Sequence, residues 1–330
     1  MNPYQHVRSV SAAKCTVSQS SNAMPARHGT TNTTRLPNVS IEPSLARPRV
    51  NGSAPDGNAK TGAQTNTRTL TSAQDAGRHH TALRAALELR KAKALTPYNS
   101  DAWTAELHNA GIINRFSTIP DGLKLGFRID FPNITHVQIP MNAPSINTYS
   151  SEFGDTIQKE IIKGRYIGPF PLSLIYDTLG PFQSSPLSLI PKPGRPGKFR
   201  LVQNFSFPST PNSANPSPSI NSGIDADNFP TTWGKFSTVY LLAARLPSGS
   251  EVATRDVAEA YRTVPLHHSQ WPAAVVHTSQ SEGCIDTCLA FGASPSAGVY
   301  GHVADAAAEI FRHHGIGPLD KWVDDHIFFE

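Results

Sequence analysis

Apolar residues first recur at helical intervals in residues 79–95, HHTALRAALELRKAKAL, with arginines and lysines beside them. Thr96-Pro97 should end this helix. Its basic side chains are compatible either with contact to nucleic acid or with the solvated face of a docking helix. Residues 1–76 are rich in Ser, Thr, Asn, Pro and Ala and have no apolar period, so they predict a disordered tail.

Helical and extended patterns alternate over the next 70 or so residues of the chain. DAWTAELHNAGII predicts a helix that closes near Gly111, and FRIDFPNITHVQI predicts one or two strands interrupted by Pro132. SEFGDTIQKEIIKGRYI predicts a helix that begins at its first residues, Ser151 and Glu152, and stops at Gly164. Residues 97–150 indicate no particular chemistry.

A Pro/Gly turn, GRPG, separates two strand-like runs at Pro186–Pro191 and Lys198–Phe205 and predicts a hairpin. GRPGK is not a phosphate-binding P-loop, because its glycine spacing is wrong and a phenylalanine follows the lysine. Residues 208–234 are rich in Pro, Ser and Asn and predict a long ordered loop. Several cations gather on the hairpin: Lys192, Arg195, Lys198 and Arg200.

Residues 235–330 alternate helices with short strands. KFSTVYLLAARL predicts a buried helix, VATRD a strand that ends at Asp256, and WPAAVVHT and CIDTCLAF two more strands. SPSAGVYGHVADAAAEIFRHHG predicts a long helix, and KWVDDHIFFE a hairpin with Asp324-Asp325 at its tip. Helices gathered on one face of these strands predict an α+β layer whose opposite face is open to a ligand.

Asp256, Asp324 and Asp325 would converge if their two strands were neighbours. Three carboxylates in one place repel one another and raise one another's pKa values. A divalent cation such as Mg²⁺ resolves that conflict, and two such ions can stabilise the attacking and leaving oxygens of a phosphoryl transfer. The alternative is that Asp324-Asp325 simply form a polar turn.

Charge is unevenly distributed along the 330 residues, although the net value is only +4. Residues 1–100 hold 13 Lys and Arg against 4 Asp and Glu, a net of +9, and residues 101–330 hold 16 against 21, a net of −5. This pattern fits either a polyanion-binding arm or a soluble tail.

Metal-binding and targeting patterns are weak. Cys284 and Cys288 form a lone C-x3-C, and the three HH pairs lie far from it, so neither a disulfide framework nor a zinc site is indicated. The N-terminal residues lack an apolar signal core, and no apolar run is long enough to cross a bilayer. We expect an intracellular protein, cytoplasmic or nuclear, with no membrane partner.

Four segments resemble, in the same order, the motifs of reverse transcriptases. KFRLVQNFS resembles the fingers strand, and RDVAEAYRTVPLH the palm motif D-x4-[FY]. LAFGASPSAGVYGHV resembles the F-G motif with its following helix, and WVDDHIFF resembles [FY]-x-DD. The resemblance covers roughly residues 150–330. The segments SSPLSLIPKPGRPGKFRLVQNFS and KWVDDHIFF are most similar to polymerases of fungal DIRS/Ngaro-type retroelements, a kind of retrotransposon.

The resemblance implies a metal-binding role for the carboxylates. Asp256 and Asp324 would bind two Mg²⁺ ions, Asp325 would be the supporting carboxylate, and the Val257 carbonyl would complete a metal shell. Trp322 departs from the family pattern, since a tyrosine or phenylalanine usually precedes x-DD.

The resemblance also implies a nucleotide site. Lys198 and Arg200 would meet the triphosphate, Tyr261 would lie under the sugar and disfavour a 2′-OH, and Phe291 and Gly292 would pack near the nascent base pair. Gln203 and Asn204 stand where many relatives carry an aspartate, and we assign them no role. Read without the resemblance, Tyr261 is a core tyrosine and the cations are ordinary surface residues.

We therefore expect the α+β fold of a right-hand polymerase. Its parts would be a disordered basic tail (1–76), an N-terminal extension (77–150), fingers (151–234) and a partial palm (235–330), with no thumb after Glu330. The predicted activity is RNA-directed DNA polymerase, a nucleotidyltransferase, using an RNA or DNA template-primer and deoxynucleoside triphosphates, in a truncated or decayed retroelement polymerase. A catalytically inactive nucleic-acid-binding remnant is the alternative, and a nuclease would leave the hairpin cations and Tyr261 without a role.

Overall fold

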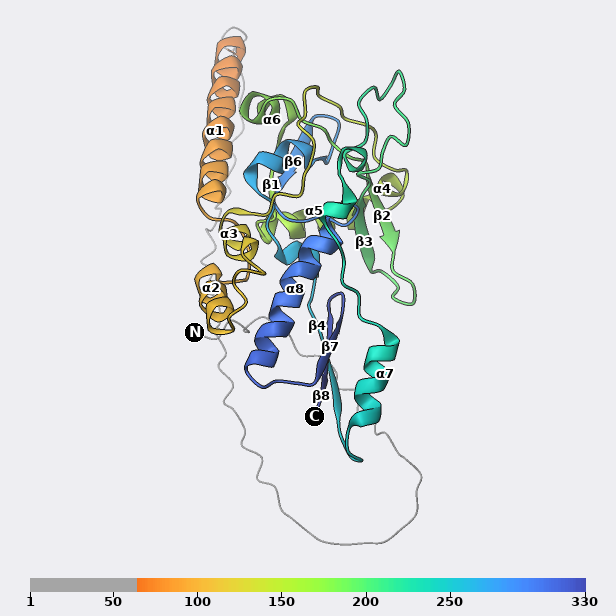
Figure 1. The fold of residues 1–330 in the computed structure, drawn as a ribbon. Helices are drawn as coiled ribbons and strands as arrows, with labels where there is room; N and C mark the ends of the chain where they lie inside the picture. The colour runs from red at the N-terminus through yellow and green to blue at the C-terminus, as the bar shows by residue number, and fades with distance from the viewer. Residues whose placement is uncertain (1–63) are drawn as a thin grey trace, which may run out of the picture. The chain divides into compact units, whose positions relative to one another are not determined.

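A long helix opens the part of the chain that the structure describes (Figure 1). This computed structural model describes residues 64–330, with side chains from residue 77 onward. Helix α1 (Gln64–Ala92) contains most of the helix predicted at 79–95 but begins earlier, because no proline interrupts the preceding residues. Of the predicted tail, residues 1–63 lie outside the described residues. Ser18–Asp75 form a separate unit, so the description below concerns residues 76–330.

Short helices follow α1 in the predicted N-terminal extension. They are α2 (Ser100–Asn109), α3 (Thr118–Leu125) and α4 (Ser145–Thr148). The Asn99 side chain caps α2 by accepting hydrogen bonds from the backbone N–H groups of its first turn, at 3.0 and 3.1 Å. The buried Leu83 and Leu87 of α1 join the main core.

The strands predicted within FRIDFPNITHVQI are wrong. This stretch makes only isolated bridges, from Phe127 to Leu266 and from Gln138 to Gln183. The reason is that the Gln270 side chain, not a neighbouring strand, accepts the backbone hydrogen bonds of Ile129 and Phe131, at 3.2 and 2.9 Å.

The predicted fingers region is built on two small sheets. Helix α5 (Ser150–Ile162) and the hairpin of β2 (Leu187–Pro191) and β3 (Phe199–Gln203) confirm the predictions there. Strand β1 (Tyr166–Pro171) and helix α6 (Leu172–Leu179) were not predicted, since two prolines obscure the strand pattern. β1 pairs with β6 (Glu282–Asp286), which pairs in turn with β5 (Val275–His277), giving the order β1-β6-β5.

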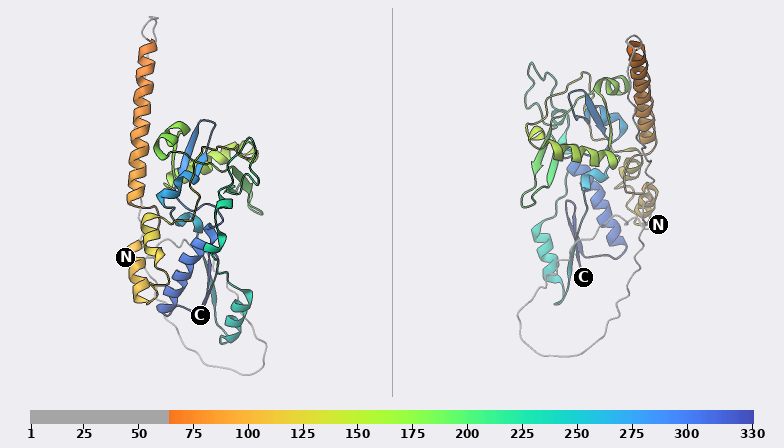
Figure 2. Two further views of the ribbon diagram at one scale, coloured as in Figure 1. Left: turned by 45° about the horizontal axis from the view of Figure 1, so that its top comes forward. Right: turned by 180° about the vertical axis from the view of Figure 1, so that it is seen from behind.

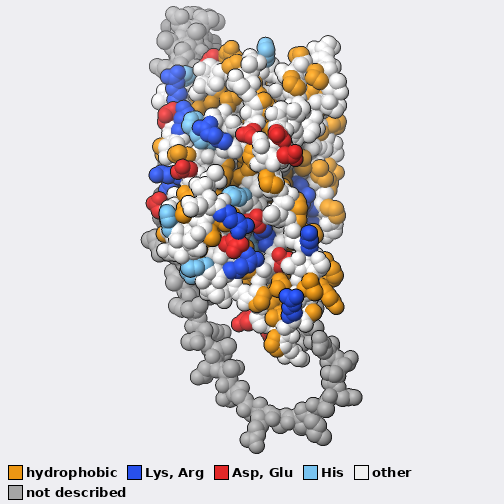
Figure 3. Space-filling view, in the orientation of Figure 1, with side chains coloured by type: hydrophobic (Ala, Val, Ile, Leu, Met, Phe, Trp, Pro, Cys, Tyr) orange, Lys and Arg blue, Asp and Glu red, His pale blue; other side chains and the backbone are white. Residues whose placement is uncertain are grey.

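Helix α7 (Phe236–Arg245) follows the long loop, which holds two short 3₁₀ turns at Asn221–Gly223 and Ala226–Asn228. The prediction that this helix is buried is wrong, because α7 has no buried residue. Phe236, Tyr240 and Leu241 are 79%, 61% and 51% exposed, and hydrophobic side chains gather over α7 in Figure 3. An apolar helix pattern alone does not say which neighbour covers it.

A three-stranded sheet of order β4-β8-β7 holds the predicted carboxylates. β4 (Val252–Asp256) comes before the 3₁₀ turns η3 (Ala260–Thr263) and η4 (His268–Ala273), and helix α8 (Ser296–His313) leads into β7 (Leu319–Trp322) and β8 (Asp325–Phe329). Both neighbouring pairs are antiparallel. Both views in Figure 2 show α8 beside this sheet, so the predicted helix and closing hairpin are confirmed.

The main core joins α1, α2, α3, α8 and the β1-β6-β5 sheet. Trp271 and Tyr300 are among its largest fully buried side chains, at 1% exposure each. Phe311 of α8 packs edge-on against Phe328 of β8 with ring centroids 5.5 Å apart, so α8 covers one face of the β4-β8-β7 sheet. In the part of the chain described here, the helices are all too short or too polar to cross a membrane.

Candidate active site

Two strands distant in sequence bring the predicted carboxylates together. β4 and β8 pair antiparallel, with Asp256 directly opposite Asp325, and the Val257 N–H donates to the Asp324 carbonyl at 3.0 Å. Side chains at directly opposed positions lie on the same face of a sheet, so Asp256 and Asp325 share one face. Asp324 lies in the turn at the end of the same pair. The tip of one hairpin and the end of β4 therefore meet in space.

Val323 shapes the tip of this hairpin. Its φ of 54° is in the left-handed region, where a β-branched residue is an outlier that costs roughly 1–2 kcal/mol. Such strain persists only where surrounding structure holds it, here the β7–β8 pairing of Trp322 with Asp325. The strained turn places two carboxylates in succession at the end of β8.

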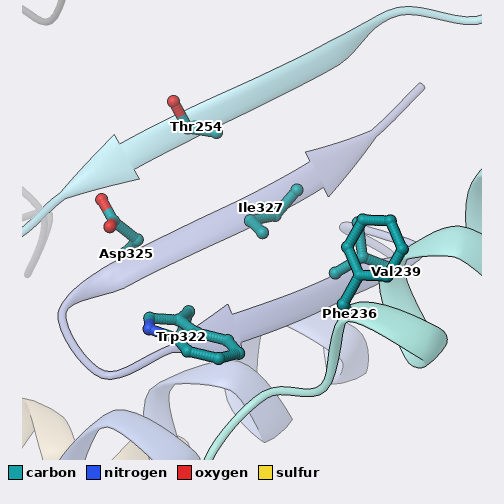
Figure 4. Close-up of a pocket in the computed structure, with 6 residues that line it drawn as sticks. All are labelled: Phe236, Val239, Thr254, Trp322, Asp325 and Ile327. Carbon is teal, nitrogen blue, oxygen red and sulfur yellow. The ribbon is translucent and has the colours of Figure 1, made fainter.

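The face that carries Asp325 is hollowed beside α7 (Figure 4). The hollow has a volume of about 430 Å³, and its lining side chains come from α7 and from all three strands. Figure 4 shows Asp325, Ile327 and Trp322 on the same side of the sheet, with Thr254 of β4 beside them. The prediction of an open face therefore needs one correction: α7 borders that face. The lining residues are Phe236, Val239, Thr254, Trp322, Asp325 and Ile327.

Negative charge at this site is not balanced by protein cations. Among the described residues, no lysine or arginine forms an ion pair with Asp256, Asp324 or Asp325. Burial raises the pKa of Asp256, and the charge of Asp324 raises it further. Burial and the charges of Asp324 and Asp256 raise the pKa of Asp325 in the same way. Raised pKa values are expected for neighbouring carboxylates whose charge no cation compensates.

The donor atoms suit a hard divalent ion. Carboxylate and carbonyl oxygens are the ligands of Mg²⁺, and Asp256, Asp324 and the Val257 carbonyl offer only oxygen. No three His, Cys, Asp or Glu side chains within residues 77–330 are gathered closely enough to hold an ion, so the three predicted aspartates do not form such a group. Mg²⁺ is usually bound through one or two carboxylates, with waters and substrate phosphates as the remaining ligands.

A row of aromatic rings leads from the carboxylates to the fingers hairpin. Tyr261 packs against Phe291 with ring centroids 4.9 Å apart, and the Arg200 guanidinium lies over Phe291 at 5.8 Å from its centroid. Burial raises the pKa of Tyr261, and the charge of Asp324 raises it further. Three predicted site residues are thus joined in one continuous arrangement.

Gly292 follows Phe291 and packs closely against β3, whereas Lys198 lies apart from the aromatic rings. A Cβ atom at Gly292, whose φ is 113°, would overlap the carbonyl oxygen of Gln203, so only glycine allows this close approach to β3. Lys198 is exposed at the start of β3, and in the described structure no side-chain contact joins it to the other predicted site residues.

Tyr300 is a site neighbour that sequence reasoning missed. This α8 residue is 1% exposed, and its ring centroid lies 5.8 Å from that of Tyr261. Burial raises its pKa, and the charges of Tyr98, Asp324 and Asp256 contribute in the same direction. The helical pattern predicted a buried residue there, but only the tertiary structure brings its ring against Tyr261.

A buried ion network holds the turn that carries Tyr261. Arg262, 9% exposed in its side chain, pairs with Asp286 at 2.7 Å and with Glu160 at 2.9 Å, and it also donates to the Leu289 carbonyl at 3.0 Å. The first two partners lie on β6 and α5. The segment after Asp256 is therefore fixed to the fingers region as well as to the sheet.

Of the known proteins compared with this chain, only solved structures are similar to it. No protein-family model matches, and no curated protein matches. Solved structures that are similar include a foamy viral protease-reverse transcriptase in complex with an RNA/DNA hybrid, with 14% identity, a TM-score of 0.42 and coverage of 69% of this chain and 28% of that one. Native prototype foamy virus protease-reverse transcriptase is similar at 16% identity and a TM-score of 0.41, over 75% of this chain and 28% of that one.

A further foamy viral protease-reverse transcriptase, in complex with double-stranded DNA, is similar at 16% identity and a TM-score of 0.36, over 62% of this chain. The chain spans 28% of the length of each of these three structures. The three solved structures described here are all foamy viral protease-reverse transcriptases.

Proposed function

We propose that this chain contains the fingers and part of the palm of a reverse transcriptase-like domain, which performs template-directed nucleotidyl transfer with two Mg²⁺ ions. One observation carries the proposal: β4 and β8 pair so that Asp256 opposes Asp325 beside Asp324, with no protein cation among them. The order of the four sequence motifs supports the same function.

The carboxylates have separate roles in this proposal. Asp256 and Asp324 hold the ions, the Val257 carbonyl adds one oxygen, and Asp325 supports the negative potential from the same sheet face. When bound, the two ions supply positive charge to the attacking 3′-oxygen and to the departing pyrophosphate. The strained turn at Val323 keeps the carboxylates in position before substrate arrives.

The nucleotide contacts follow from the aromatic row. Arg200 offers a planar guanidinium to the triphosphate. The guanidinium lies over the Phe291 ring, and this contact limits the motion of the Arg200 side chain. Tyr261 would contact the deoxyribose, where a 2′-OH would clash with its ring, and Gly292 leaves room beside the nascent base pair. Lys198 adds a second cation to the same exposed hairpin.

The finer identity of the enzyme is proposed from the sequence resemblance alone. We propose a retroelement polymerase of the DIRS/Ngaro type that copies an RNA or DNA template from a primer with deoxynucleoside triphosphates. The residues of two segments, SSPLSLIPKPGRPGKFRLVQNFS and KWVDDHIFF, carry this assignment.

Primer extension on an RNA template tests the activity. The 330-residue chain should add deoxynucleotides to a DNA primer with Mg²⁺, and Asp324→Ala should reduce extension by at least about 100-fold. Asp155→Asn, an exposed carboxylate of α5, is the matched control and should extend normally. Extension that survives Asp324→Ala would refute the polymerase assignment.

A nucleic-acid-binding remnant is the second candidate, and the exposed cations of the β2–β3 hairpin favour it. Lys192, Arg195, Lys198 and Arg200 are all exposed. If this reading holds, the chain binds a template-primer, loses affinity as salt rises, and extends nothing. Asp256→Asn would then leave binding unchanged or tighter, since it removes a negative charge.

A further inference from the structure

Lys321 is a buried cation that the proposed reaction does not use. It lies on β7, three residues before Asp324, and is 6% exposed. Its neighbour Trp322 lines the hollow on the open face, so the alternation of a strand turns Lys321 toward α8. A buried ammonium group is retained only where close partners compensate its charge.

Three partners surround the Lys321 ammonium group. Its Nζ atom lies 2.7 Å from Oδ1 of Asp305 and donates to the carbonyl oxygens of Gly301 and Thr232, at 3.2 and 3.3 Å. The Thr232 hydroxyl donates to Oδ2 of Asp305. One ammonium group therefore joins β7, helix α8 and the segment before α7.

The turn of α8 that holds Gly301 also contacts the candidate site. Gly301 follows Tyr300, whose ring packs against Tyr261 in the turn after Asp256. Backbone pairing of β4 with β8 sets the lateral position of Asp256 and Asp325, but it does not fix how far the hairpin stands above α8. Phe311 of α8 packs on Phe328 of β8, and Arg312 of α8 donates to the Leu319 carbonyl of β7 at 3.2 Å. The Lys321 contacts add a constraint at the other end of β7, next to the turn, because they tie the hairpin to the helix turn that also contacts Tyr261.

We propose that Lys321, with Asp305 and Thr232, is a positioning group that sets the height of the Asp324–Asp325 turn for divalent-ion binding. This inference rests on the proposed function. Groups that orient metal ligands from behind typically change metal affinity by about 10- to 100-fold when they are removed. Lys321 does not touch the ion or the substrate.

Mn²⁺ binding to the full chain, measured by electron paramagnetic resonance titration, tests the inference without any need for turnover. Lys321→Met, which keeps the length of the side chain and removes its charge, should weaken Mn²⁺ binding by about tenfold or more. Asp305→Asn should weaken it in the same direction, and Lys321→Arg should retain most of the affinity. Asp324→Asn marks the loss of a ligand itself.

Glu309→Gln is the matched control. Glu309 is also on α8 and forms ion pairs with Arg115 and Arg312, each at 3.3 Å, at the far end of the helix. It should bind Mn²⁺ as the wild type does. Urea unfolding of every variant separates folding from binding, since a merely structural role would lower the unfolding midpoint and leave the affinity of the folded protein unchanged.

Two outcomes are distinct. Equal Mn²⁺ affinity in the wild type, in Asp305→Asn and in folded Lys321→Met would overturn the positioning role alone. If Lys321→Met does not fold, Asp305→Asn and Lys321→Arg decide the question by the same measurement. A wild type that binds no Mn²⁺, or binds it as well without Asp324, would overturn the proposed function and this inference together.

Discussion

Asp324→Asn removes a charge that raises the pKa of both Asp256 and Asp325, and it should stabilise the metal-free protein. Burial and the charge of Asp324 raise the pKa of Asp256. A carboxyl group whose pKa is raised on folding binds more protons in the folded state, so its ionisation lowers stability as pH rises above the ordinary value. The penalty is fully present at neutral pH, and the variant removes part of it.

The expected gain is small but measurable. Like charges on neighbouring positions of a sheet cost roughly 0.2–1 kcal/mol each. Solvent screening keeps the value low, because Asp256 is exposed and Asp324 and Asp325 are partly exposed. Relief of the two repulsions that involve Asp324 should therefore contribute about 0.5–1 kcal/mol in the absence of metal. For a unit of this size, about 1 kcal/mol raises the Tm by roughly 2–4 °C.

Divalent ions should make the wild type more stable than Asp324→Asn. An ion present at about tenfold over its Kd stabilises the folded state by about 1.4 kcal/mol, and the wild type should gain this while Asp324→Asn gains little. Thermal unfolding at pH 7.5 in EDTA and in Mg²⁺ measures both effects, with Asp155→Asn as the control for loss of an exposed carboxylate. A destabilised variant in EDTA, or equal Mg²⁺ stabilisation of variant and wild type, would refute the reasoning.

Three further predictions concern residues around the site. Gly292→Ala should destabilise the fold by more than about 1 kcal/mol in urea unfolding, because its Cβ would overlap the Gln203 carbonyl at a positive φ. Arg262→Met should cost about 3 kcal/mol in the same assay, since it leaves the buried Asp286 without its cation and leaves Glu160 paired with Arg165 alone. Burial, the neighbouring His268 and an arginine lower the pKa of His267 to about 4. The folded state therefore binds fewer protons than the unfolded one, and stability should fall by about 1–3 kcal/mol as pH drops from 6.5 to 4.

Matched variants check these predictions. Gly154→Ala places a methyl group in open space on α5 and should not destabilise the fold. The exposed pair of Lys91 with Glu88 is the control for Arg262, and Lys91→Met should change stability by less than about 1 kcal/mol. His267→Gln should flatten the acid dependence, and an unchanged dependence would assign the loss of stability to other groups.

Local elements of the fold were predictable because local patterns specify them. Helices α2, α5 and α8 and the β2–β3 hairpin follow from apolar periodicity and Pro/Gly turns. The strands expected between residues 127 and 139 did not form, because the Gln270 side chain accepts their backbone hydrogen bonds. That residue is more than 130 positions away, and no local pattern reports it.

The sequence by itself determined the chemical inventory of the site: which carboxylates, which aromatic ring and which hairpin cations are available, and in what order. Only the tertiary structure decided that Asp256 opposes Asp325, that Tyr300 packs against Tyr261, that α7 is uncovered and that Lys321 is buried. The physical reason is that strand register and burial depend on contacts between segments about 70 residues apart, whereas periodicity reports only which side of its own element a residue occupies.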